Sequence, residues 1–210
     1  MLLRAFCSML VMLAVPGLAP AASPAQQDFQ EASSKMPDLQ RGARLFVTCA
    51  GCHGADGRGD RDGSVPVIAG QHARVIMRQL ADYRHARRWN PRMQHYADNH
   101  VLPDAQAIAD VAGHAASLAR GGAGTGRGDL LAAGRQLHSA HCASCHGPTG
   151  EGDAATLVPR IGGQHYAYLL RVFHEAVEGA RPNFPADHLR LLERFDGDQL
   201  IGLADALARF

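Results

Sequence analysis

The sequence has no cysteine to spare for a structural disulfide. It contains five cysteines, of which four lie in two short repeated motifs and the fifth, Cys7, lies near the N-terminus. It also has almost no net charge, because 21 Lys and Arg residues are set against 20 Asp and Glu residues. A charge of this size gives no reason to expect a nucleic-acid partner.

The sequence also lacks an apolar run long enough to span a bilayer. The run Ala5–Ala14 is short for a transmembrane helix. It follows Arg4 and precedes a Pro16-Gly17 break and the small residues Ala19-Pro20-Ala21. This layout is typical of a secretory signal peptide. We therefore expect residues 1–21 to be cleaved and the protein to be exported to the periplasm; the alternative is a retained membrane anchor.

Two Cys-x-x-Cys-His motifs, starting at Cys49 and Cys142, carry the chemistry of the chain. This pattern is the signature of covalent haem c attachment. Two thiols one helical turn apart can each add to a vinyl group of one porphyrin, and the adjacent histidine then binds the iron as its proximal ligand. A zinc knuckle or a redox dithiol is the alternative, and two complete matches in an exported chain argue against both. The sequence therefore predicts two haems c, attached and ligated by Cys49, Cys52 and His53 and by Cys142, Cys145 and His146.

The chain also repeats itself at a spacing of 93 residues. Pro66 falls on Pro159, the Gly70-Gln71-His72 stretch falls on the stretch starting at Gly163, and Arg88 falls on Arg181. A register kept over so long a stretch indicates two copies of one domain. We expect domains at residues 38–118 and 129–210, a glycine-rich linker at residues 119–128 and an N-terminal tail at residues 22–37.

Each copy is expected to be helical. In the first copy, Asp38 is placed to cap a helix that runs into the first motif. An amphipathic helix over Ala73–Arg87 and a third helix starting near Asp104 follow. Domains of some eighty residues usually need a staple, which a covalent haem supplies.

The ordered set of motifs resembles the tandem two-domain cytochromes c, and most closely the cytochrome c4 family. The resemblance covers the chain after the signal peptide. It rests on Cys-x-x-Cys-His-Gly, Pro-x-Ile-x-Gly-Gln and the Arg-x-Asn-Pro-x-Met stretch, in that order. It implies an all-α fold of two small helical domains, each with a haem between its first and last helices, and electron transfer between the two haems.

The same resemblance implies a partner for each proximal histidine. A ligating histidine donates its second ring N–H to an acceptor that fixes the ring. In similar proteins that acceptor is the carbonyl of a proline, and Pro66 and Pro159 each lie 13 residues after the corresponding histidine. The alternative is that both are ordinary turn prolines.

The sixth ligand differs between the two halves. Met93 matches the family's axial methionine in the first half, whereas Met77 lies inside the amphipathic helix and is expected in the core. No methionine follows Met93, and its counterpart at a spacing of 93 is Ala186. We expect His188, two residues further on, to bind haem 2; the alternatives are an open iron and a solvent-facing role for both His188 and its counterpart His95.

The other histidines of the second half are weaker candidates. His174 lies in a helical pattern, and His165 repeats His72, which indicates a shared structural role. His138 and His141 are expected on the surface. If imidazole replaces thioether at haem 2, ferric iron is stabilised there. We then expect two well-separated potentials, with electrons entering at the lower-potential haem 2 and leaving from haem 1.

Arginines crowd the second helix and the following loop of the first half. They could form a docking patch for an acidic partner or donate to haem propionates; a solvated helix face is the alternative. Arg88 repeats as Arg181, so these two are expected to act near each haem. The cluster consists of Arg78, Arg84, Arg87, Arg88 and Arg92.

The function expected from these features is periplasmic electron transfer. Redox-protein partners are expected, namely a dehydrogenase or respiratory donor and a terminal oxidase or reductase, and peripheral association with a membrane is compatible with this role. The alternative is a haem enzyme, or an enzyme subunit, that acts on a small substrate at haem 2. A fixed subunit of a larger membrane complex is a third reading.

Overall fold

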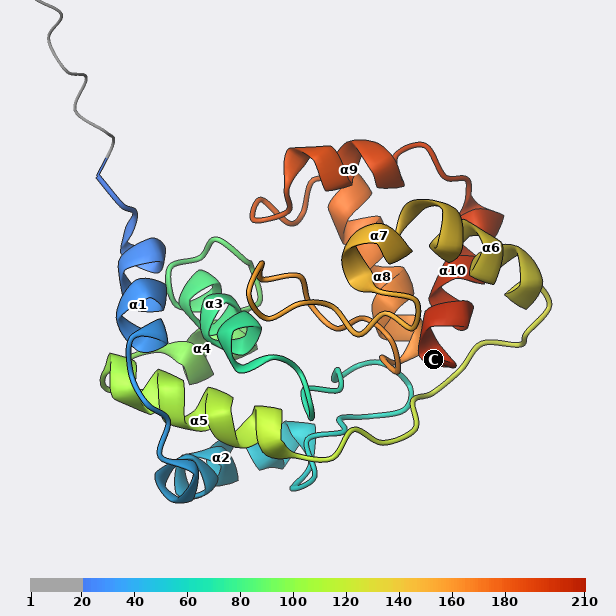
Figure 1. The fold of residues 1–210 in the computed structure, drawn as a ribbon. Helices are drawn as coiled ribbons and strands as arrows, with labels where there is room; N and C mark the ends of the chain where they lie inside the picture. Colours follow the sequence, from blue (N-terminus) through green and yellow to red (C-terminus); the bar gives the residue numbers. More distant parts are fainter. Residues whose placement is uncertain (1–20) are drawn as a thin grey trace, which may run out of the picture.

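The computed structural model describes residues 21–210, which form ten α-helices and no strand. The helices separate into a first domain, α1–α5, and a second domain, α6–α10, with the connecting segment running along one side (Figure 1). The all-α, two-domain prediction is confirmed. The expected signal peptide lies outside the described residues, apart from Ala21. Among residues 21–210, no helix is both long and apolar enough to cross a membrane.

The first domain follows the predicted order of elements. Asp38 caps α2 through its side chain, as Asp104 caps α5. The amphipathic helix α3 ends at Arg84, three residues earlier than expected, and the segment around Met93 is a short helix, α4, rather than a loop. The helices are α1 (Pro24–Ser33), α2 (Leu39–His53), α3 (Ala73–Arg84), α4 (Pro91–Ala97) and α5 (Ala105–Ser117).

Residues 22–37 are not the expected tail. Ser23 and Gln26 form a capping box that starts α1, and Phe29 is buried on its inner face. The helix packs against α3 and α5, and Asp28 forms an ion pair with Arg84 at 3.0 Å. The composition suggested a tail because only three residues of α1 are buried, and their partners are distant in the sequence.

In each domain the helix that leads into the Cys-x-x-Cys-His motif crosses the last helix at a glycine. A side chain at Gly42 of α2 would collide with the carbonyl of Asp110 in α5. In the second domain, Gly134 lies against Gly202 in the same way. The two helices therefore touch directly at the crossing. The crossing pairs α2 with α5 and α6 (Leu131–His141) with α10 (Gly197–Ala208).

The second domain contains one extra residue before its motif. Seven positions separate Gly42 from Cys49, whereas eight separate Gly134 from Cys142. Helix α2 runs unbroken to His53, but in the second domain the helix breaks at Cys142. The remaining helices are α7 (Ala143–His146), α8 (Tyr166–Val177) and α9 (Ala186–Leu192).

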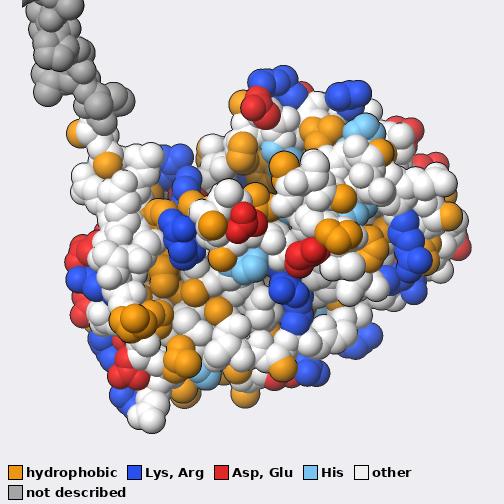
Figure 2. All heavy atoms as spheres, in the orientation of Figure 1, with side chains coloured by type: hydrophobic (Ala, Val, Ile, Leu, Met, Phe, Trp, Pro, Cys, Tyr) orange, Lys and Arg blue, Asp and Glu red, His pale blue; other side chains and the backbone are white. Residues whose placement is uncertain are grey.

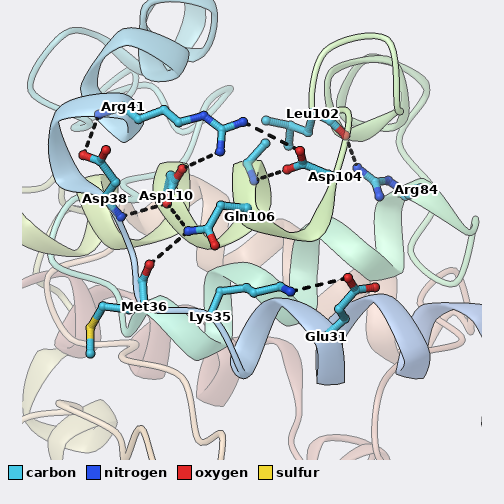
Figure 3. A network of polar contacts seen from close by, with 11 residues as sticks. Glu31, Lys35, Met36, Asp38, Arg41, Arg84, Leu102, Asp104, Gln106 and Asp110 are labelled. Atoms are coloured by element: carbon cyan, nitrogen blue, oxygen red, sulfur yellow. Dashed lines mark hydrogen bonds and ion pairs between the residues drawn. The ribbon is translucent and has the colours of Figure 1, made fainter.

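A buried carboxylate fixes α2 on α5. Asp110 accepts the backbone N–H of Asp38 at 2.8 Å and a guanidinium N–H of Arg41 at 3.1 Å. Gln106 donates to the same carboxylate at 2.7 Å and to the Met36 carbonyl at 2.9 Å (Figure 3). Because Asp38 and Arg41 lie at the start of α2, and Gln106 ties the preceding turn to α5, the network sets the entry angle of the helix that carries the first motif.

The two domains meet across a local twofold axis. Gln71 donates to the Arg160 carbonyl at 2.8 Å and accepts the Arg160 N–H at 2.9 Å. Gln164 makes the same two bonds to Val67, at 2.8 and 2.9 Å. Gln71 and Gln164 are related by the 93-residue spacing, as are Val67 and Arg160, so the interface is isologous within one chain.

A second reciprocal pair supports this symmetry. The Nε2 atom of His72 lies 2.9 Å from the Glu151 carbonyl oxygen, and that of His165 lies 2.7 Å from the Arg58 carbonyl oxygen. The shared structural role expected for His72 and His165 is therefore confirmed. It consists in joining the domains.

The linker is held in place along the second domain. The backbone N–H groups of Gly126 and Gly128 donate to Asp205 of α10 at 2.8 and 2.7 Å. Gly124 donates to Nδ1 of His165 at 2.9 Å. These bonds give the glycine-rich linker a defined path.

Candidate haem centres

The first centre lies at the C-terminal end of α2. Cys49 and Cys52 are one helical turn apart, and His53 is the last residue of the helix, with 6% of its surface exposed. The Nδ1 atom of His53 lies 3.1 Å from the Pro66 carbonyl oxygen. Because a carbonyl only accepts, Nδ1 carries the proton and Nε2 keeps its lone pair. Burial lowers the pKa of His53, which favours the neutral ring that binds metals.

The second centre repeats this arrangement on α7. His146 is 8% exposed, and its Nδ1 atom lies 3.0 Å from the Pro159 carbonyl oxygen. Burial also lowers the pKa of His146. Both proline carbonyls are thus the acceptors that the sequence predicted. In each centre the proline comes from the loop that returns beneath the motif helix.

Each motif supplies too few ligands for a structural zinc site, which takes four protein ligands. Burial raises the pKa of the Cys49 thiol and of the Cys142 thiol to about 11. Within residues 21–210 there is no group of three or more His, Cys, Asp or Glu side chains able to hold a metal ion. Each motif supplies two thiols and one imidazole, which is the set that covalent haem requires.

His188 faces the proximal histidine of the second centre. It lies on α9, half-buried, and its ring centroid is 6.0 Å from that of His146. Two imidazoles that share one iron from opposite sides, with metal–nitrogen bonds of about 2 Å, have ring centres about 6 Å apart. Phe184 stacks on His188 with centroids 4.8 Å apart and holds the ring in this position. The pair therefore has the separation of a bis-histidine haem site.

The counterpart His95 behaves differently. It is exposed on α4, where its ring packs against Tyr96 and His100 with centroids 5.1 and 4.4 Å away. The alternative of a solvent-facing role for both histidines therefore applies to His95 and not to His188. Ala186, which replaces the methionine, is exposed at the first position of α9.

Met93 lies in the first turn of α4. Its backbone N–H donates to Oδ1 of Asn90 at 3.0 Å, and the residue is half-buried. Asn90 thus caps the short helix that carries the expected ligand. Met77 is 3% exposed within the core cluster of the first domain, as predicted.

One histidine was placed wrongly by the sequence. His138 is 1% exposed and packs against Phe210, with ring centroids 4.9 Å apart. It lies four residues after the crossing Gly134, as Phe46 lies four after Gly42, so it takes a core position of the first helix. The extra residue in α6 hid this match from the 93-residue register. His141 and His174 are exposed, in line with their low rank as ligands.

The arginine cluster of the first domain is engaged within the molecule. Arg78 and Arg87 pair with buried Asp82, and Arg84 pairs with Asp28 and donates to two carbonyls. Lys and Arg side chains are spread over both domains on the face in Figure 2. Neither a docking patch nor a solvated helix face describes the cluster as a whole; only Arg92 is exposed.

Arg88 and Arg181 meet at the domain interface. Arg88 donates to the Tyr168 hydroxyl at 2.6 Å and lies over the Tyr83 ring, and Arg181 lies over Phe184. Burial lowers the pKa of Arg181, and the nearby Arg88 lowers it further. The Nε atom of Arg181 is buried without a hydrogen-bond partner among the described residues. These cations fit a group that brings carboxylates, as haem does.

Two further buried arginines were missed by the sequence analysis. Arg120 and Arg160 also carry buried Nε atoms with no partner in the described part of the chain. Arg120 has no counterpart in the repeat, and Arg160 replaces Val67 of the first domain, so the repeat gave no signal for either residue. The tertiary structure brings both to the interface.

Comparison with known proteins agrees with this architecture. The cytochrome c family model matches residues 39–114 and 131–194. Cytochrome c4 of Pseudomonas aeruginosa is 31% identical over 187 residues, covering 84% of this chain and 82% of that protein. A thiosulfate dehydrogenase electron acceptor of Stutzerimonas stutzeri is 32% identical, with 77% and 78% covered. Reduced recombinant cytochrome c4 from Pseudomonas stutzeri has the same fold, with a TM-score of 0.72 at 24% identity, covering 82% of this chain and 98% of that one.

Two Cys-x-x-Cys-His helices, each with a buried histidine held by a proline carbonyl, define a dihaem c-type cytochrome. Both family-model matches fall on the two domains that carry these helices. The chain belongs to the cytochrome c4 family. It is an electron-transfer protein with two covalently bound haems c and redox-protein partners.

Proposed function

We propose that this protein is a periplasmic carrier that passes single electrons from a dehydrogenase or respiratory donor to a terminal oxidase or reductase. The observation that supports this most directly is the position of His188 opposite His146. A centre with two protein ligands on its iron favours outer-sphere electron transfer, whereas substrate chemistry needs an open position.

The proposed ligand sets differ between the centres. Haem c supplies one-electron chemistry between ferric and ferrous iron when it is bound. His53 and Met93 would hold the iron of the first centre, and His146 and His188 that of the second. The thioethers would form at Cys49, Cys52, Cys142 and Cys145, and Arg88 and Arg181 would accept haem carboxylates.

In this proposal the iron ligands set the direction of electron transfer, and neighbouring residues orient those ligands. Pro66 and Pro159 accept hydrogen bonds from the Nδ1–H groups and orient each proximal ring, while burial keeps each ring neutral. A thioether ligand favours ferrous iron, and a second imidazole favours ferric iron. Electrons would therefore enter at the second centre and leave from the first. The reciprocal bonds of Gln71 and Gln164 keep the two centres at a fixed separation.

A redox titration followed by visible spectroscopy tests this function. We expect two one-electron waves, a low-spin spectrum in both oxidation states and no spectral change of the ferrous protein with carbon monoxide. Both haems titrating together at one high potential would contradict the two ligand sets. A ferrous spectrum that changes with carbon monoxide would favour the haem-enzyme alternative instead.

A second candidate names the donor. The similarity to a thiosulfate dehydrogenase electron acceptor supports a role as the acceptor of a dehydrogenase that oxidises a sulfur compound. Mixing the oxidised protein with a thiosulfate dehydrogenase and thiosulfate, and following haem reduction by stopped flow, tests it. Reduction no faster than that of an unrelated cytochrome c would argue against this donor. Export is tested separately by N-terminal sequencing of the purified protein, where we expect a start after residue 21.

A further inference from the structure

Arg120 lies where the two halves of the molecule meet. It follows α5 and donates from Nη1 to the Ala69 carbonyl at 3.1 Å. Its side chain fills the space beside two glycines: a Cβ on Gly70 would lie 3.3 Å from Arg120 Cβ, and one on Gly163 would lie 3.2 Å from Arg120 Nε. Gly70 and Gly163 are related by the 93-residue repeat. Arg120 is therefore a single residue close to the local twofold axis.

The charge of Arg120 is not balanced by the described residues. Its Nε and Nη2 atoms are buried and have no hydrogen-bond partner there. Burial first, and then the nearby guanidinium of Arg160, lower its pKa to about 10. Arg160 follows Pro159, the acceptor for His146, and its own Nε atom is also buried and unpartnered. For Arg120, a buried guanidinium beside a second cation and with no carboxylate in contact is costly.

A comparison with the other arginines of the described chain shows that a part-buried guanidinium without a carboxylate in contact is unusual. Nine have a carboxylate in ion-pair contact: Arg41, Arg58, Arg78, Arg84, Arg87, Arg127, Arg171, Arg190 and Arg209. Six others without such a contact are exposed: Arg44, Arg61, Arg74, Arg92, Arg135 and Arg194. Among residues 21–210, only the interface arginines Arg88, Arg120, Arg160 and Arg181 are part-buried and have no carboxylate in ion-pair contact.

We propose that Arg120 and Arg160 form a shared oxyanion-binding site at the domain interface, between the two haem centres. The ligand would be a carboxylate of a bound haem or a free oxyanion such as sulfate. In the first case the inference rests on the proposed function. In both cases Arg120 is a positioning residue, because it acts on both centres through the anion and its own field.

The consequence is an effect on both centres from one residue. A buried cation near a haem favours the ferrous state, since reduction adds a negative charge. Replacing Arg120 by Gln removes that cation and keeps a planar polar side chain. We therefore expect both midpoint potentials to fall, whereas a residue belonging to one domain would shift mainly one of them.

The experiment compares the wild-type dihaem protein with Arg120→Gln, Arg120→Lys and Arg160→Gln. Arg135→Gln, at an exposed position of α6, is the matched control. Spectroelectrochemistry gives both midpoint potentials, and thermal unfolding is measured in sulfate and in chloride at equal ionic strength. Arg120→Gln is expected to lower both potentials and the Tm, and Arg120→Lys to restore the potentials toward wild type. Arg160→Gln is expected to lower mainly the potential of the second centre.

The sulfate series separates the two sources of the anion. If the site binds a free oxyanion, sulfate should raise the Tm of wild type but not that of Arg120→Gln. Haem carboxylates predict no specific sulfate effect and lowered potentials in the variants. The oxyanion site would be contradicted if the potentials and Tm of Arg120→Gln shifted no more than those of Arg135→Gln and sulfate had no effect. If Arg120→Gln does not accumulate, Arg160→Gln and the sulfate series on wild type decide.

The proposed function is tested separately from the oxyanion-binding site. Haem content and the axial-ligand spectrum are measured on the same samples. A protein that lacks two covalent haems would contradict the proposed function. A specific effect of sulfate on the Tm of that protein would still support the oxyanion-binding site.

Discussion

His188 and His146 face each other in the second domain with ring centroids 6.0 Å apart, although they lie on different helices and 42 positions apart in the chain. In the first domain the counterpart of His188 is exposed and packs on its neighbours. One repeat thus turns a histidine inward where the other turns it outward. In the proposed ligand set, His188 takes the place of the methionine that the second repeat lacks.

Replacing His188 by Ala should open the second centre. We expect a high-spin component in the electronic absorption and EPR spectra, and binding of carbon monoxide by about half of the ferrous haem, because the sixth ligand is lost at one of two sites. His174→Ala is the matched control, since His174 is exposed on α8. An unchanged low-spin spectrum with no carbon monoxide binding in His188→Ala would remove His188 from the ligand set.

Exchanging His188 for Met should bring the two potentials closer together. A thioether stabilises ferrous iron more than imidazole does, and axial ligands tune haem potentials over about 0.8 V. The potential of the second centre should therefore rise toward that of the first. Spectroelectrochemistry measures both waves; an unchanged lower wave would mean that His188 does not set it.

The interface glutamines should support the docking of the two domains. Gln164→Ala leaves the buried N–H and carbonyl of Val67 without partners. We expect a loss of about 2 to 4 kcal/mol in the free energy of unfolding, or separate unfolding of the two domains. Urea denaturation followed by haem absorption and by circular dichroism measures this. Gln136→Ala, at an exposed position of α6, should change stability by less than about 0.5 kcal/mol.

The helix crossing of the second domain should not accept a side chain. At Gly134 an added methyl group would collide with the Gly202 carbonyl. Gly134→Ala should therefore lower the free energy of unfolding by about 2 kcal/mol or more, despite the better helix propensity of alanine. Gly197→Ala is the control, because no atom lies within 4 Å of the added methyl group. Equal stability of the two variants would contradict the close crossing.

Acid should weaken the attachment of the linker. Burial raises the pKa of Asp205, but Arg209 and the N–H groups of Gly126 and Gly128 more than offset this, so the pKa lies below its usual value of 3.8. A lowered folded-state pKa contributes stability above pH about 4 that is lost as the pH falls through that lower value.

The matching variant is Asp205→Asn. It should be less stable at pH 7 by about 1 to 3 kcal/mol, and its stability should fall less steeply below pH 4 than that of wild type. Thermal unfolding between pH 2.5 and 7 measures both effects. Asp198→Asn, exposed on the same helix, should follow the wild-type profile; parallel profiles for wild type and Asp205→Asn would contradict the role of Asp205.

Several outcomes show why part of the site could not be read from the sequence. His138 was expected on the surface, because one extra residue before Cys142 shifted it out of the 93-residue register. The segment 22–37 was expected to be a tail, because α1 finds its partners on α3 and α5, which are distant in the sequence. Arg120 carried no repeat signal at all, since only the folding of both domains brings it beside Gly70 and Gly163.

The sequence by itself determined the two haem-attachment motifs, their proximal histidines and proline acceptors, and the duplication of a small helical domain. These features depend on spacing along one helix or one loop, and local geometry fixes them. The tertiary structure alone decided which of two matching histidines turns inward, how the halves pair about a twofold axis, and where unbalanced arginines gather. Such features depend on burial, and burial is set by elements that lie far apart along the chain.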